Sequence, residues 1–305
     1  MELKAIHTQL QDEVLSVLHY YLLFHYPLTL QEIHANFPSK ITEDTVLTAL
    51  NNLVAKKKVY TFNGFYSIEA DIKSIVLDRQ KGNKLAAEKE QDARRSAALI
   101  YKFPFVRFVG LSGSLSKGYA EEDSDIDFFI ITESNRLWIC RTLLHIFKKF
   151  TFLTGTQHKY CMNYFIDTEE IALKDNNRYT AVELTTLVPI HGSEYYTDLI
   201  NANDWVKDFL PNAKQKNHVV QDRKHLMKSL IEGLTDVLHI GKPVNYLLMK
   251  LTDSRWKTKW YKRNYPANDY NVAFKTTLHI SKNHPANYQK RVLKHLSERV
   301  NLKFL

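Results

Sequence analysis

Two short motifs constrain this chain more than any other feature of its sequence. A Gly113-Ser114 pair follows an apolar run, and an Asp125-Ile126-Asp127 triplet opens the next apolar run. Glycine at the end of a strand lets the backbone approach an anion, because no Cβ stands in the way. Ser114 offers a hydroxyl and a backbone N–H, and a helix that begins there points its positive end at the same anion. The first motif therefore predicts a phosphate-binding turn.

The second motif supplies negative charge beside that turn. Asp125 and Asp127 are two residues apart, so on a strand both side chains project from one face. Two adjacent carboxylates repel each other unless a divalent cation lies between them. Mg²⁺ commonly takes one or two carboxylates together with substrate phosphates, and Mn²⁺ accepts the same oxygen ligands. An ionised acid at the start of an apolar strand costs free energy unless it is paired or metal-bound. This cost disfavours the alternative that the two motifs are only an ordinary turn and a capping aspartate.

The two motifs together predict one site for a nucleoside triphosphate and its metal ion. In this hypothesis Asp125 and Asp127 are the catalytic, metal-binding carboxylates, while Gly113 and Ser114 bind the triphosphate. Lys117 lies three residues after Ser114, where it either contacts the γ-phosphate or is an exposed lysine of the turn.

Composition places the chain among ordinary globular proteins. It has 305 residues, of which 44% are apolar and 25% charged, and this length allows two or three domains. No apolar run approaches the ~18 residues that cross a bilayer. The first residues lack the layout of a signal peptide, and two cysteines, Cys140 and Cys161, cannot form a disulfide framework or a zinc site. We therefore expect a cytoplasmic protein without a membrane partner.

The positive charge is concentrated in the last third of the chain. Residues 201–305 carry 20 Lys and Arg against 8 Asp and Glu, whereas residues 1–200 carry 22 against 25. This asymmetry favours a polyanionic partner there, such as RNA or another phosphate-rich molecule, or else a solvated helical surface.

The N-terminal 70 residues have the pattern of three helices followed by a hairpin. A capping box begins at Thr29, and Thr42 caps the third helix. Asn63-Gly64 stands between two aromatic-rich runs, which is a strong hairpin signal. Three helices and a two-stranded wing resemble a winged helix-turn-helix domain. Its third helix begins with two acids and the segment contains no arginine, so DNA binding is disfavoured relative to a protein contact or a substrate-positioning role.

The rest of the chain divides into three further segments. A helical connector interrupted near Gly82-Asn83 precedes a segment that alternates strand and helix, as a small mixed α/β sheet does. A predominantly helical, basic domain follows. The expected boundaries are 1–70, 71–102, 103–180 and 181–305.

The order and spacing of the motifs resemble the DNA polymerase β-like nucleotidyltransferase superfamily. Its signature is Gly-Ser, about ten residues, then Asp-x-Asp after a strand, and the resemblance covers roughly residues 105–167. It implies that Gly113 and Ser114 hold a nucleoside triphosphate while Asp125 and Asp127 hold two Mg²⁺ ions. The chain also resembles bacterial members that place a winged helix before this domain and a helical part after it. The expected fold is therefore α+β and multidomain: a winged helix-turn-helix, a small mixed α/β nucleotidyltransferase sheet and a helical C-terminal domain.

One position departs from the superfamily pattern. The superfamily usually supplies a third carboxylate from the next strand, which here reads Tyr160 to Asp167. Asn163 occupies the middle of that strand, and its amide cannot take a proton. Asp167 has the same strand parity but lies about four residues further on, roughly 13 Å along a strand. Asn163 is thus expected in the substrate site, with Asp167 or an acid outside the strand as the alternatives for the third carboxylate.

Three functional hypotheses follow. The leading one is Mg²⁺-dependent transfer of a nucleoside monophosphate from a nucleoside triphosphate to an acceptor hydroxyl, with release of pyrophosphate. The second is a catalytically degenerate, nucleotide-binding regulatory module, which Asn163 motivates. The third is a DNA-binding regulator, which the negative charge of residues 1–70 disfavours.

Overall fold

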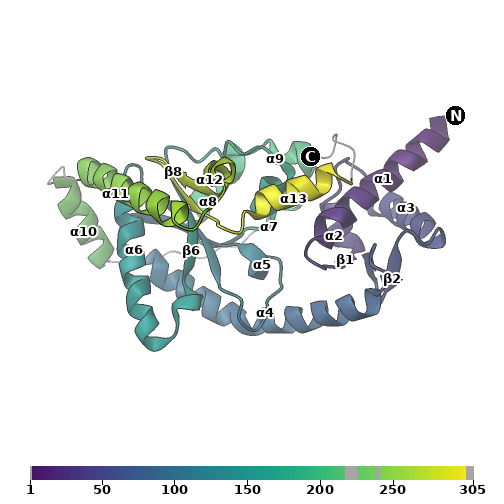
Figure 1. Ribbon diagram of the computed structural model, residues 1–305, viewed down its shortest axis with the longest axis horizontal. Coiled ribbons are helices and arrows are strands. Elements are labelled where there is room, and N and C mark those ends of the chain that lie inside the picture. Colours follow the sequence, from purple (N-terminus) through teal and green to yellow (C-terminus); the bar gives the residue numbers. More distant parts are fainter. Residues whose placement is uncertain (1, 217–225, 238–240, 300–305) are drawn as a thin grey trace.

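The structure, a computed structural model, describes residues 2–216, 226–237 and 241–299. The N-terminal helices lie at one end of the molecule, a six-stranded sheet lies in the middle, and α10 (Leu226–Val237) and α11 (Gly241–Tyr261) lie at the other end (Figure 1). None of the helices in this described part combines the length and the apolar content that a bilayer crossing requires.

Three helices and a small antiparallel sheet form the N-terminal part. The capping box at Thr29 and the cap at Thr42 are present, so both predicted helix starts are confirmed. Asn63 and Gly64 have φ values of 50° and 78°, as the predicted hairpin requires. A short strand that the sequence did not predict, β1, joins this hairpin in the order β1-β3-β2. The bounds are α1 Glu2–Leu22, β1 Leu28–Thr29, α2 Leu30–Ala35, α3 Glu43–Ala55, β2 Tyr60–Phe62 and β3 Phe65–Ser67.

A single helix of 30 residues, α4 (Ile72–Tyr101), connects the N-terminal part to the sheet. The predicted interruption near Gly82-Asn83 is wrong, because the helix continues through both residues. A Cβ on Gly82 would lie 2.2 Å from the ring of Tyr119. The glycine therefore serves the close packing of that ring on the helix and does not end the helix.

Arg79 of α4 contacts the N-terminal part through an ion pair and an aromatic ring. Its guanidinium forms an ion pair with Glu32 at 2.6 Å and lies 4.2 Å from the centre of the Tyr26 ring. The Arg79 side chain is buried, so this contact is shielded from the screening that weakens surface ion pairs. Charge and aromatic packing together fix where the N-terminal helices lie relative to α4.

Six strands form the central mixed sheet, in the order β7-β4-β5-β6-β9-β8. Strands β5 and β6 run parallel, and the other neighbouring pairs run antiparallel. The alternation of strand and helix expected within 103–180 is present. The segment 181–305 is mostly helical, as expected, but it also contributes three strands, β7, β8 and β9, that the sequence did not predict and that complete the sheet. The bounds are β4 Val106–Leu111, β5 Asp127–Thr132, β6 Cys161–Asp167, β7 Val188–His191, β8 Phe274–Thr276 and β9 Ile280–Asn283.

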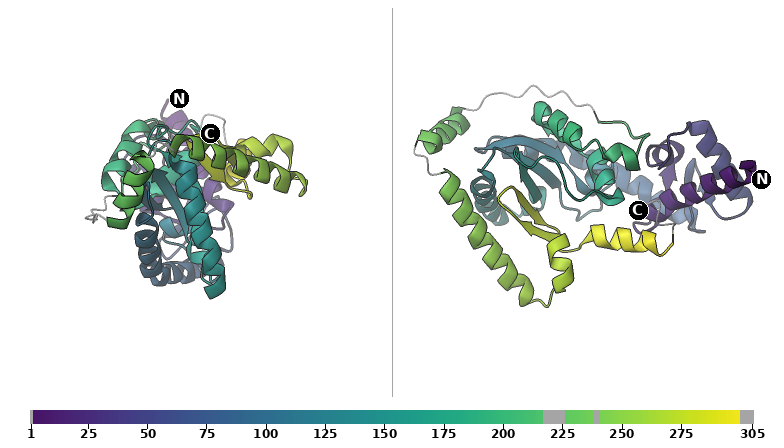
Figure 2. Two further views of the ribbon diagram at one scale, coloured as in Figure 1. Left: turned by 90° about the vertical axis from the view of Figure 1, so that its left-hand side faces the viewer. Right: turned by 90° about the horizontal axis from the view of Figure 1, so that it is seen from above.

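The remaining helices lie around the sheet, except α13, which lies beside the N-terminal helices (Figure 2). A helix was predicted over 217–240, of which 217–225 and 238–240 lie outside the described residues. The bounds are α5 Gly113–Ser116, α6 Leu137–Thr151, α7 Arg178–Thr186, α8 Ser193–Ala202, α9 Val206–Phe209, α12 Ala267–Ala273 and α13 Tyr288–Ser297, with 3₁₀ turns at Phe152–Thr154 and Gln157–Lys159.

Apolar side chains of β5 alternate between the two faces of the sheet. Phe128 and Ile130 pack into the core that α4 and α6 complete. Phe129 and Ile131 pack on the other face, against residues of α7 and α8. Asp127 has the same strand parity as Phe129 and Ile131, so its side chain belongs to the α7 face.

The N-terminal helices also border this face of the molecule. Buried residues of α1 and α3 form one core with Ala181 and Val182 of α7 and with Val292 and Leu296 of α13. Figure 2 shows α13 beside the N-terminal helices in the view from above. Segments far apart in the sequence, α1, α3, α7 and α13, thus share one core.

Candidate active site

The Gly113-Ser114 turn lies directly against Asp127. Gly113 has φ 68°, in the left-handed region that favours glycine, and a Cβ there would lie 2.5 Å from Asp127 Oδ2. The backbone N–H of Ser112 donates to the carbonyl oxygen of Asp127 at 3.0 Å. Two motifs that were separate in the sequence therefore form one compact site.

The helix that begins at the turn is short. It comprises four residues, Gly113 to Ser116, so it contributes one turn of aligned peptide dipoles. Ser114 is exposed, which leaves its hydroxyl and backbone N–H open to an anion. An anion at this turn would depend on these local donors and on nearby cations more than on a helix dipole.

Asp127 is the first residue of β5, whereas Asp125 lies in the irregular segment before it. The expectation that both acids lie on a strand therefore holds for Asp127 alone. They remain electrostatic neighbours. Burial raises the pKa of Asp127 to about 6, and the negative charge of Asp125 contributes to that rise. A cation between the two carboxylates would relieve both effects.

Asn163 faces the same acid from the neighbouring strand. The register of the β5–β6 pair shifts so that Phe128 pairs with Met162 and Phe129 with Tyr164, which leaves Asn163 as the extra residue. Its Nδ2 lies 3.4 Å from Asp127 Oδ1. The same amide donates to Cys161 Sγ at 3.0 Å, and burial raises the pKa of that thiol to about 12.

Asp167 lies at the other end of the same strands. It pairs with Thr132, while Cys161 pairs with Asp127. Its buried carboxylate accepts hydrogen bonds from the backbone of Asn135 at 3.0 Å and lies 2.8 Å from His279 Nδ1. Asp167 therefore organises the loop after β5 and lies too far along the strand to join Asp127.

Lys117 connects the turn to an acid that the sequence did not single out. Its ammonium donates to the carbonyl oxygen of Gly113 at 3.1 Å and forms an ion pair with Glu183 of α7 at 2.9 Å. The charge of Glu183 also contributes to the raised pKa of Asp127. No local pattern marks Glu183, because it reaches this site through tertiary packing of α7 against the sheet.

The residues present fit a divalent cation that shares its ligands with a substrate. Among the described residues, no group of three or more His, Cys, Asp or Glu side chains is arranged to hold a metal ion. Two carboxylates are nevertheless what Mg²⁺ commonly takes from a protein when phosphates and water supply its other ligands. Asp125 and Asp127 would hold such a cation beside the Gly113 turn.

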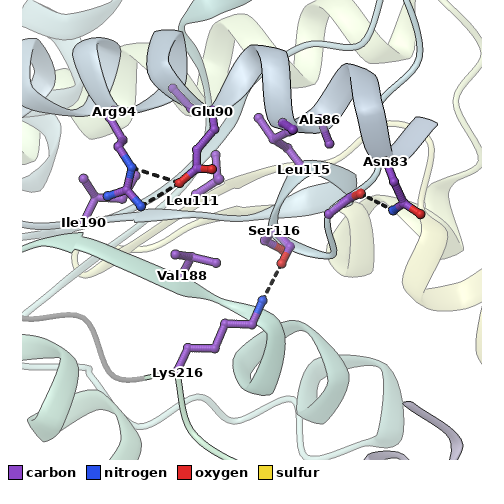
Figure 3. A pocket seen from close by; sticks show the side chains of 13 residues that line it. Asn83, Ala86, Glu90, Arg94, Leu111, Leu115, Ser116, Val188, Ile190 and Lys216 are labelled. Carbon is purple, nitrogen blue, oxygen red and sulfur yellow. Dashed lines mark hydrogen bonds and ion pairs between the residues drawn. The ribbon is translucent and has the colours of Figure 1, made fainter. Parts of the chain in front are cut away.

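A cavity of about 300 Å³ lies behind the turn, between α4 and the sheet (Figure 3). Leu111, Leu115 and Ile190 contribute to its apolar wall. Lys216 at its rim donates to the carbonyl oxygen of Ser116 at 2.6 Å, and burial lowers the pKa of this ammonium. Asp127 belongs to the opposite face of the sheet, so this cavity is separate from the acids.

Comparison with known proteins agrees with this arrangement. Residues 96–184 match the family model described as a nucleotidyltransferase domain, a range that includes both motifs, Asn163 and Glu183. No curated protein and no solved structure matches the chain. Residues 96–184 of this chain are therefore similar to a nucleotidyltransferase domain, which is consistent with the resemblance to the polymerase β-like superfamily.

Proposed function

We propose that the protein catalyses Mg²⁺-dependent transfer of a nucleoside monophosphate from a nucleoside triphosphate to an acceptor hydroxyl, with release of pyrophosphate. The observation that carries this proposal is the contact of the left-handed Gly113 turn with Asp127 inside a nucleotidyltransferase domain. This contact supports the binding of a triphosphate and of a metal ion in one place.

Each side chain of the site has a separate role in this proposal. Asp125 and Asp127 would hold the cation, Mg²⁺ or alternatively Mn²⁺, which when bound would supply positive charge against the α-phosphate and the leaving pyrophosphate. Ser114 donates its hydroxyl and backbone N–H to the β- and γ-phosphates. The Lys117 ammonium, which contacts the carbonyl oxygen of Gly113, adds a charge-assisted contact. Asn163 donates its two amide N–H groups to Asp127 and Cys161, so its carbonyl oxygen is the atom that would accept a hydrogen bond from the bound substrate.

The basic C-terminal part supports an RNA or another phosphate-rich acceptor. Residues 241–299 carry 13 Lys and Arg against 3 Asp and Glu. On α11, Tyr246 and Tyr261 are exposed, and the Lys250 ammonium lies 5.4 Å from the centre of the Tyr246 ring. Exposed aromatic rings among cations suit a single-stranded nucleic acid, because bases stack on rings while phosphates contact the cations. We propose that the N-terminal part is a winged-helix domain, and that its role is to contact another protein or to position the acceptor.

The test follows the two ends of the triphosphate separately. Nucleoside triphosphates labelled at the α- or the γ-phosphate are incubated with Mg²⁺ and a single-stranded RNA at low and high salt. We expect the α-label to join the RNA and the γ-label to leave as pyrophosphate, with less transfer at high salt and none after chelation of Mg²⁺. Transfer of the γ-label, or turnover that survives chelation, would contradict the proposal.

A second candidate function is a nucleotide-binding regulatory module without turnover. Asn163 favours it, because an amide stands where the superfamily usually places a carboxylate. In this case the protein binds the Mg²⁺–nucleotide complex, but neither label leaves the nucleotide with any acceptor.

A further inference from the structure

Glu183 of α7 contacts the Gly113 turn through Lys117 and belongs to the electrostatic environment of Asp127. It lies on α7 one helical turn after Tyr179, so the two side chains share a face of that helix. The charge of Glu183 contributes to the raised pKa values of both Asp127 and Tyr179, and the charge of Asp127 contributes to that of Tyr179. The three groups thus lie in one electrostatic environment.

The accessible part of Glu183 meets a lysine of the phosphate-binding turn. Its side chain is 30% exposed and forms the 2.9 Å ion pair with Lys117, whose side chain is 20% exposed. The same ammonium holds the carbonyl oxygen of Gly113. One ammonium therefore contacts both the Gly113 turn and the Glu183 carboxylate.

We infer that Glu183 accepts the proton of the acceptor hydroxyl, and that Lys117 masks this carboxylate until a triphosphate binds. This inference rests on the proposed function. The acceptor O–H bond breaks and its proton goes to a carboxylate oxygen of Glu183, while the hydroxyl oxygen forms a bond to the α-phosphorus. The bond from the α-phosphorus to the bridging oxygen breaks, and its electron pair leaves with pyrophosphate. Asn163 cannot take this proton, since an amide is no base near neutral pH.

Nucleotide binding provides the switch. A triphosphate at the Gly113 turn brings several negative charges next to Lys117, whereas Glu183 offers one. An ammonium on a flexible four-carbon chain can turn from the carboxylate to the phosphates. Glu183 then loses its cation at the moment when a base is needed. The arrangement predicts ordered addition, with the nucleotide before the acceptor.

The test separates catalysis from binding. We expect Glu183→Gln to lower kcat by about 10²- to 10³-fold, within the usual contribution of a general base. The same variant is expected to bind the Mg²⁺–nucleotide complex as tightly as the wild type or more tightly, because Lys117 is released. Glu194→Gln, at an exposed position of α8, is the matched control and should change neither quantity. A loss of structure at α7 would weaken nucleotide binding as well as lower kcat. A lower kcat with unchanged or tighter nucleotide binding therefore identifies Glu183 as the base.

A second substitution tests whether Glu183 acts as the base. Asn163→Asp places a carboxylate on the strand beside Asp127, so in the Glu183→Gln background it should restore kcat at least about tenfold. Full activity of Glu183→Gln, while Asp127→Asn is inactive, would overturn the inference and leave the proposed function intact. A wild-type protein that binds the Mg²⁺–nucleotide complex but never releases pyrophosphate would overturn both.

Discussion

Replacing Asp127 by asparagine is expected to reduce pyrophosphate release by about 10³-fold or more. The side chain keeps its size but loses the charge that holds a divalent cation. Metal ions supply several kcal/mol of transition-state stabilisation, and each 1.36 kcal/mol corresponds to a factor of ten in rate. The measurement is initial-rate pyrophosphate release by purified wild-type and variant protein at equal, saturating nucleotide and Mg²⁺.

The same substitution should not weaken the fold. Burial raises the pKa of Asp127 to about 6, so without a bound cation the ionised carboxylate is less favourable in the folded chain than in the unfolded chain at neutral pH. A neutral amide removes that cost, and we expect an equal or higher Tm. Asp123→Asn, at an exposed position in the same loop, is the control and should keep full activity. An Asp127→Asn protein that keeps more than a tenth of wild-type activity would contradict the assignment.

Replacing Gly113 by alanine is expected to reduce activity by about 10²-fold and to lower the free energy of unfolding by about 2 kcal/mol. Two effects combine at this position. A left-handed φ of 68° costs an L-residue roughly 1–2 kcal/mol, and the new Cβ would lie 2.5 Å from Asp127 Oδ2. The carboxylate must move, and a displacement near 1 Å in a catalytic group can lower the rate about 10²-fold.

Gly155 offers a matched control for this substitution. It has φ 67°, close to that of Gly113, but nothing lies within 4 Å of the Cβ that alanine would add. Gly155→Ala should therefore lower the free energy of unfolding by about 1 kcal/mol through the backbone alone and leave activity unchanged. Chemical denaturation and the pyrophosphate assay measure both variants side by side. Equal activity of the two alanine variants would show that the Gly113 turn does not position Asp127.

Local signals in the sequence were sufficient to predict much of the fold. The caps at Thr29 and Thr42 and the Asn63-Gly64 hairpin depend on neighbouring residues alone, and the structure contains all three. Gly82 was misread as a helix interruption, because glycine weakens helices in general. Its role depends on Tyr119, which is distant in the sequence and could not be seen from local pattern.

The strands of the C-terminal part were missed for physical reasons. β7 contains Pro189, and proline inside a strand disfavours a strand assignment unless the strand lies at an edge of the sheet, which is where β7 lies. β8 and β9 comprise three and four residues, too few to show a clear alternation. These strands are stabilised by long-range pairing, of β7 with β4 and of β9 with β6, which no local sequence pattern indicates.

The site was predictable where it depends on one stretch of chain. Gly113 and Asp127 lie on consecutive elements, and their contact follows from the short connection between them. The strand that was expected to include Asp125 begins only at Asp127. Glu183 was missed, since it belongs to a helix whose packing against the sheet no local pattern reveals.

The central claim is that the contact between the Gly113 turn and Asp127 forms a metal–nucleotide site, and equilibrium binding tests it most directly. Calorimetric titration of the full chain with a nucleoside triphosphate, with Mg²⁺ and after chelation, requires no acceptor. We predict binding that needs the cation, persists in Gly155→Ala and is lost when Asp125 and Asp127 are both replaced by alanine. Nucleotide binding that is indifferent to Mg²⁺ and to the double replacement would contradict the claim.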